Sequence, residues 1–169
     1  MKLGIAAFPS KKFQDLVNSY RKRYDPHYSL IPPHLTLMAS FDTDEGQIEK
    51  IVGRLRETAG KCTPFTMEVL KVSTFQPVNN VIYLKIDPNQ ALLSLHDEII
   101  SSLEGKEEYA YVPHITLAQG LSNDEHSDVY GQLSLLQLRH EETIDRFQLL
   151  YQLENGTWAV HDTFQLGGE

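Results

Sequence analysis

Two short segments of the chain place a histidine and a threonine two positions apart between apolar residues. The first is PHLTL at residues 33–37, and the second is PHITL at residues 113–117. Imidazole titrates near neutral pH, so it can take a proton from an attacking hydroxyl group or give one to a leaving oxygen. A threonine hydroxyl can donate a hydrogen bond to a non-bridging phosphate oxygen. Two such sets in one place would suit acid–base catalysis on a phosphodiester without a metal ion.

The alternation within each segment predicts which side chains face the same way. Side chains alternate between the two faces of a β-strand, so His34 and Thr36 share one face while the leucines share the other. If helices cover the leucine face, the polar face lines the open side of the sheet. We therefore expect both residues to meet their counterparts, His114 and Thr116, in one cleft.

The two segments belong to a longer repeat. His114 follows His34 by 80 positions. The same offset relates a predicted strand at 2–8 to 82–88, a helix at 10–24 to 90–104, and a strand at 65–75 to 145–155. The order strand, helix, motif strand, helix, strand thus occurs twice, which predicts two similar lobes related by a pseudo-two-fold axis.

The elements that position the motifs follow from hydrophobic periodicity. Helical spacing is present at residues 10–24, with Ser10 as the N-cap, and at 44–59, 89–103 and 122–138. Strand patterns occur at 2–8, 34–41, 65–75, 81–87, around HITL, and at 143–153 and 158–166. We predict one α+β domain over residues 1–169, in which two lobes of antiparallel sheet carry helices on their outer faces and enclose a central cleft.

Charge and composition limit the class of protein. The net charge of −8 and the pI of about 5.3 leave no global positive field for nucleic acid or an anionic membrane. A single cysteine, Cys62, excludes an intramolecular disulfide framework and a cysteine-rich zinc site. The apolar run at 2–8 ends at Pro9, so we interpret it as a strand rather than a signal peptide. We expect a soluble, cytoplasmic protein with no membrane span.

Other residues that could do chemistry have simpler interpretations. His27, in the proline-rich loop at 25–33, could border the cleft, but a surface position is favoured. The run Arg21, Lys22, Arg23 ends a helix, where cations match the dipole, so we interpret it as a solvated end. Histidines without a repeat partner are interpreted as structural or exposed: His96, His126, His140 and His161.

Several aromatic residues and one lysine near the motifs are weaker candidates. Tyr83, Lys85, Tyr109 and Tyr111 could stack on a base or contact phosphate. Half-buried sheet tyrosines and a solvated lysine are the favoured interpretation, because aromatic residues are common in strands. No zinc-binding motif is present in the sequence, so we predict no metal and no cofactor.

The duplicated motif, HLTL at 34–37 and HITL at 114–117, resembles the signature of the 2H phosphoesterase superfamily. That superfamily includes 2′,3′-cyclic nucleotide phosphodiesterases and bacterial 2′,5′ RNA ligase-like proteins. Length, motif positions and the leading MKLGIAAFPS are most similar to its small YjcG-like branch of Gram-positive bacteria. The resemblance implies a bilobal fold and metal-independent cleavage or formation of a cyclic or 2′-linked phosphodiester.

The resemblance also implies roles for the motif residues. His34 and His114 are expected to be catalytic, and Thr36 and Thr116 are expected to bind the substrate. We assign His34 as the proton donor and His114 as the acceptor, an assignment that the reverse reaction exchanges.

The leading hypothesis is a phosphoesterase that acts on small nucleotides or RNA ends and requires no protein partner. The alternative is a non-catalytic module that holds an RNA end or a nucleotide in the same cleft. The acidic pI counts against long RNA, whose binding depends on many phosphate contacts.

Overall fold

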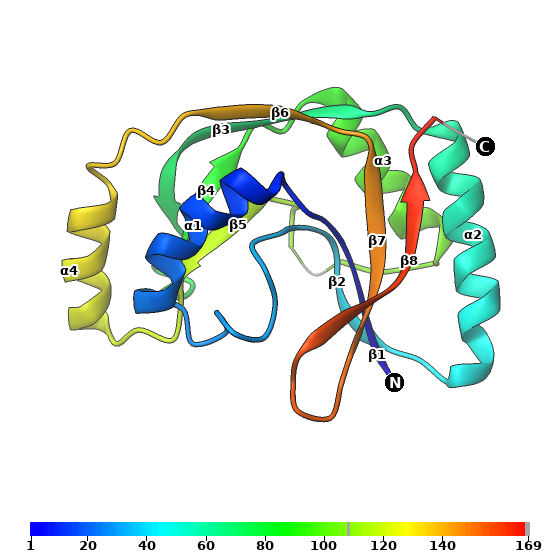
Figure 1. Cartoon of the computed structure of the whole chain (residues 1–169), viewed down its shortest axis with the longest axis horizontal. Helices are drawn as coiled ribbons and strands as arrows, with labels where there is room; N and C mark the ends of the chain where they lie inside the picture. The colour runs from blue at the N-terminus through cyan, green and yellow to red at the C-terminus, as the bar shows by residue number, and fades with distance from the viewer. Residues whose placement is uncertain (108, 168–169) are drawn as a thin grey trace.

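Two antiparallel four-stranded sheets form the frame of the molecule (Figure 1). The computed structural model describes residues 1–107 and 109–167. The strands are β1 (Lys2–Ala7), β2 (Leu35–Asp42), β3 (Phe65–Thr74), β4 (Ile82–Ile86), β5 (His114–Ala118), β6 (His140–Ile144), β7 (Arg146–Gln152) and β8 (Trp158–Gln165). The helices are α1 (Lys11–Tyr24), a 3-10 turn at Glu45–Gln47, α2 (Ile48–Lys61), α3 (Gln90–Ser102) and α4 (Asn123–Leu133).

The first three strands of the two sheets have the same order once the repeats are exchanged, whereas the fourth strands, β8 and β6, are not related by the repeat. One runs β2-β1-β7-β8 and the other runs β5-β4-β3-β6. The third strand of each repeat pairs in the sheet of the other repeat, β3 with β4 and β7 with β1. The predicted α+β class, antiparallel pairing and duplication are therefore confirmed. The exchange of the third strand also interlocks the lobes, because neither sheet is complete without a strand from the other repeat.

The helices also cross between the repeats. The Ser10 side chain accepts a hydrogen bond from the Phe13 amide at 3.3 Å, which confirms the predicted N-cap of α1. From there α1 packs on β5, whereas its counterpart α3 packs on β2. Figure 1 shows α2 and α4 at opposite ends of the molecule. None of the helices in the described part of the chain has the length and apolar character needed to cross a membrane.

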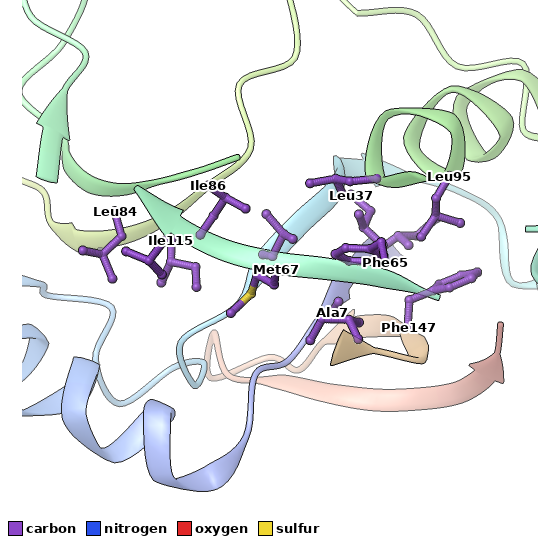
Figure 2. Close-up of a cluster of buried hydrophobic side chains, with 14 of the residues drawn as sticks. Ala7, Leu37, Phe65, Met67, Leu84, Ile86, Leu95, Ile115 and Phe147 are labelled. Atoms are coloured by element: carbon purple, nitrogen blue, oxygen red, sulfur yellow. The ribbon is translucent and has the colours of Figure 1, made fainter. Parts of the chain in front are cut away.

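One hydrophobic cluster joins both sheets and holds the leucine faces of the motifs. Leu37 of β2 and Ile115 of β5 are fully buried in it, as are Leu35 and Leu117. Figure 2 shows Leu37 and Ile115 in one cluster with β3, which crosses the centre of the view. The motif histidines and threonines are only half-buried. The predicted alternation of core and open faces is thus confirmed.

Two predicted boundaries are wrong. The helix predicted at 122–138 ends at Leu133, because the apolar spacing continues into a connection that leads to β6. The strand predicted at 143–153 is broken at Asp145, where the chain passes from β6 in one sheet to β7 in the other. Both errors have the same cause. The apolar pattern of the sequence continues past the residue at which the backbone changes its hydrogen-bonding partners.

The two faces of β5 predict opposite responses to truncation. Leu117→Ala should lower the free energy of unfolding by about 2–5 kcal/mol, because it leaves a cavity in the shared core. Thr116→Ala, on the open face, should cost about 1 kcal/mol or less. Urea unfolding of both variants checks this, and equal losses would show that the alternation of faces is wrong.

Candidate active site

A cleft of about 410 Å³ lies where the two motif strands meet. β2 and β5 are edge strands of their sheets, and they contact each other. The cleft is lined by His34, Thr36, His114 and Thr116. The structure therefore brings together all four residues singled out by the repeat, one pair from each lobe.

Both motif histidines are anchored in the same way. His34 Nδ1 lies 2.9 Å from the carbonyl oxygen of Pro32, and His114 Nδ1 lies 2.7 Å from that of Val112. A carbonyl oxygen only accepts, so each Nδ1 must carry the hydrogen and donate it. In the neutral ring this leaves the lone pair on Nε2. Each imidazole thus keeps one nitrogen for the backbone and one for a ligand.

Burial makes both imidazoles weak bases. The pKa of His34 is lowered from an ordinary 6.5 to about 4, first by desolvation and then by charge repulsion from Arg21 and His114. The hydrogen bond to Pro32 opposes this shift. Burial also lowers the pKa of His114, against the opposing effect of its bond to Val112. Both rings are therefore neutral at neutral pH.

The two histidines have different neighbours. The His114 ring contacts Phe75 and Tyr83 edge-on, with ring centroids 5.1 and 5.2 Å apart. His34 has a more distant edge contact with Phe8, at 6.4 Å. Aromatic edges fix an imidazole without removing its ligand-facing nitrogen. The two histidines therefore share the hydrogen bond to a backbone carbonyl but differ in the aromatic side chains that pack against them.

Tyr111 connects the second repeat to the first motif. Its hydroxyl donates to the carbonyl oxygen of Thr36 at 2.7 Å, and its ring stacks on buried His96 at 3.7 Å. His96 Nε2 in turn lies 2.9 Å from a carboxylate oxygen of Glu107. Burial, aided by Glu107, raises the pKa of Tyr111, so its hydroxyl stays a donor. His96 is structural, as interpreted, and it fixes the tyrosine that holds β2.

The interpretation of Arg21 as a solvated residue is wrong. Arg21 is 2% exposed, whereas Lys22 and Arg23 are exposed as expected. Its Nε donates to Asp25 Oδ2 at 3.1 Å, and its Nη2 donates to the Ile31 carbonyl at 2.9 Å. The four-residue spacing of this ion pair is visible in the sequence. Its burial is not, because the loop at 25–33 folds back over the helix end.

A histidine, a glutamine and a tryptophan are among the other residues that line the cleft. His27 is exposed, as favoured from its loop position, but it also lies in the cleft lining. Gln119 and Trp158 line the cleft as well, and sequence reasoning missed both. Gln119 directly follows the strand that carries HITL, and this position in the sequence could have pointed to a place beside the cleft. Trp158 comes from a hairpin distant in sequence, and no local pattern points to it.

The three tyrosines and the lysine that were weaker candidates do not line the cleft. Tyr83 is buried beside His114, and Tyr111 bonds the backbone, so both support the motifs from outside the cleft lining. Lys85 is half-buried on β4, opposite His114 in the strand register. Tyr109 is 72% exposed. Within residues 1–107 and 109–167, no three His, Cys, Asp or Glu side chains cluster as ligands for a metal ion.

Comparison with known proteins identifies the family. The sequence model described as "2'-5' RNA ligase superfamily" matches residues 8–156. The chain belongs to this superfamily. The resemblance to 2H phosphoesterases that the duplicated motif indicates is therefore confirmed.

Close relatives support the same class. Proteins of Bacillus pumilus and Bacillus licheniformis are 56% and 57% identical to this chain over 170 and 168 residues. The alignments cover 100% and 99% of this chain, and 99% of each relative. Both relatives are named "Putative phosphoesterase". Its superfamily and these relatives together identify the chain as an enzyme that acts on phosphoric ester bonds.

Solved structures share the fold. The crystal structure of TT0787 of Thermus thermophilus matches with a TM-score of 0.77 at 18% identity, over 100% of both chains. Escherichia coli LigT in complex with 3′-AMP matches with a TM-score of 0.73 at 14% identity, over 98% of this chain and 97% of that chain. At these identities the likeness concerns the fold of the superfamily.

The buried ion pair predicts a large stability difference between neighbouring arginines. Arg21→Ala should lower the free energy of unfolding by about 3–5 kcal/mol, because Asp25 is left as an uncompensated buried charge. Arg23→Ala, at an exposed position of the same helix, should change it by about 0.5 kcal/mol or less. Denaturation curves of the two variants measure this difference in the free energy of unfolding. A similar small loss in both variants would contradict a structural role of the Arg21–Asp25 pair.

Proposed function

We propose that the cleft hydrolyses, and in reverse forms, cyclic or 2′-linked phosphodiesters of small nucleotides or RNA ends by two-histidine acid–base catalysis. One observation carries this proposal: two imidazoles, each tied to the backbone through Nδ1, line one cleft beside two threonines. Thr36 and Thr116 donate to the non-bridging oxygens and hold the phosphorus in line for attack.

The reaction requires one proton on the histidine pair. In hydrolysis, water attacks phosphorus, and one Nε2 accepts the proton that the water loses. The bond from phosphorus to a ribose oxygen breaks, and the other Nε2 gives that oxygen its proton. The lowered pKa values leave both rings neutral at neutral pH. A bound phosphodiester anion favours protonation of both rings, but their mutual repulsion limits the pair to a single proton.

The surrounding charges favour His114 as the donor in hydrolysis. The guanidinium of Arg21 lowers the pKa of His34 by repulsion, and Asp25 opposes this with a smaller effect. The pKa of His114 is lowered by burial without a comparable charge. The shared proton therefore rests on His114, and His34 accepts the proton of water. This reverses the assignment made from the resemblance, while ligation would exchange the roles again.

The size and charge of the cleft support a small substrate. A volume of about 410 Å³ lies within the ordinary range for nucleotide-sized ligands. Escherichia coli LigT, which shares the fold, has been crystallised with 3′-AMP, NADP+, ATP and phosphate. A net charge of −8 opposes long RNA. These features favour a mononucleotide or the terminal nucleotide of an RNA.

Removal of either imidazole should abolish most turnover. His34→Ala and His114→Ala should each lower kcat/KM for 2′,3′-cyclic mononucleotides by roughly 10²–10⁴-fold, with little further loss in the double variant. EDTA should leave the wild-type rate unchanged. His161→Ala, on β8, is the matched control and should retain full activity. Unchanged hydrolysis in either motif variant would refute the mechanism. Binding of the cyclic nucleotide without any product would favour the non-catalytic alternative.

The lowered pKa values predict an acidic optimum. kcat/KM reports the free enzyme, so it requires neutral His34 and protonated His114. Activity should fall below about pH 4, as His34 gains a proton, and should fall again as pH rises through the lowered pKa of His114. The profile should be bell-shaped with its maximum between pH 4 and the ordinary histidine value of 6.5. A maximum above pH 7 would contradict the proposed protonation states.

A further inference from the structure

A side-chain network at one end of the cleft connects the two repeats. The loop at 25–33 leads from α1 to His34, and it lies against the turn that follows β5. The backbone amide of Gln119 donates to the backbone carbonyl of Tyr24 at 3.1 Å. Gly120 has a φ of +71°, and a Cβ there would lie 3.2 Å from Cγ of Pro26. This close approach brings His27 of the first repeat beside Gln119 of the second.

The network starts from the buried ion pair. Asp25 lies against the Arg21 guanidinium, so it is a carboxylate and only accepts hydrogen bonds. Its Oδ1 accepts from the backbone amide of His27 and from Gln119 Nε2, both at 2.9 Å. The carboxylate thus decides the orientation of the Gln119 amide, whose nitrogen must face Asp25.

The orientation of Gln119 decides the tautomer of His27. Gln119 Nε2 also lies 3.1 Å from His27 Nδ1. Because the amide nitrogen only donates, Nδ1 must accept with its lone pair. The neutral imidazole of His27 then carries its hydrogen on Nε2. This is the opposite tautomer to that of His34 and His114, whose Nδ1 atoms donate to carbonyl oxygens.

We propose that His27 is a third substrate-binding imidazole, which donates its Nε2–H to an anionic oxygen of the phosphodiester. This inference rests on the proposed function and extends it. His27 lines the cleft, and Gln119, Asp25 and Arg21 are positioning residues that keep its lone pair away from the substrate. An imidazole with Nδ1 occupied in this way serves as a neutral donor rather than as a base.

The cleft needs such a donor. Its Arg21 charge is balanced by Asp25, so no unbalanced cation among the described lining residues attracts the phosphate. The network is also absent from the second repeat. Positions 80 residues from Arg21, Asp25 and His27 hold Ser101, Gly105 and Glu107, and the counterpart of Gln119 is Ala39. The donor therefore marks one end of a pseudo-symmetric cleft and selects one of two substrate orientations.

Kinetics of two His27 variants test the donor. His27→Leu should lower kcat/KM for a 2′,3′-cyclic mononucleotide by roughly 10–100-fold, the loss expected for a hydrogen bond to a charged group. The pH limits of the profile should not move, because His34 and His114 set them. His27→Gln, which keeps an N–H donor at a similar reach, should recover most of the loss. His161→Leu is the control at a histidine outside the cleft. Wild-type activity in His27→Leu, or no recovery in His27→Gln, would overturn the proposal.

A second measurement does not depend on turnover. ¹⁵N NMR of the histidine side chains should show neutral His27 with hydrogen on Nε2, and inorganic phosphate should shift that signal. Gln119→Met should abolish the tautomer preference while the fold, followed by circular dichroism, is kept. Hydrogen on Nδ1 in the wild type, or no response to phosphate, would refute the role of His27. If His27 responds but no cyclic nucleotide is hydrolysed, the proposed reaction fails and the anion site stands.

Discussion

The hydrogen bond from each motif histidine to the carbonyl two residues earlier is the interaction on which the site depends. It takes up Nδ1 of His34 and His114 and leaves Nε2 for a ligand. The proline before each histidine contributes to this bond, because a residue that precedes proline is held in an extended conformation. The accepting carbonyls belong to those residues, Pro32 and Val112. The repeated PH pair therefore presets the tautomer before any substrate binds.

The interlocked sheets explain why the two motifs meet. Each repeat gives its third strand to the other sheet, so β2 and β5 remain at the edges and contact each other. The leucine faces of both edges enter one core, and the polar faces are left to the cleft. The same exchange places α1 on β5, which positions Arg21 and the loop at 25–33 at one end of that cleft. The internal symmetry brings the two motif histidines into one cleft, and its local breakdown at the loop makes the two ends of that cleft different.

Much of this arrangement was predictable from the sequence. Alternation in a strand is a local property, so the burial of Leu37 and the open position of Thr36 follow from the residues themselves. The repeat supplied the long-range contact between the motifs. The chain's passage between sheets at Asp145 was not predictable, because the choice of partner strand leaves no trace in the pattern. The burial of Arg21 and the contact between Gln119 and His27 depend on how the loop folds, for which no repeat exists.

The central claim is that the two motif histidines take up a single proton together with the phosphate group. Isothermal titration calorimetry in buffers of different ionisation enthalpy measures this directly, with sulfate as an anion whose charge does not change near neutral pH. At pH 6 the uptake should approach about one proton per sulfate, and it should be lost in the double alanine variant of His34 and His114. Binding without proton uptake, or an uptake of about two protons, would contradict it.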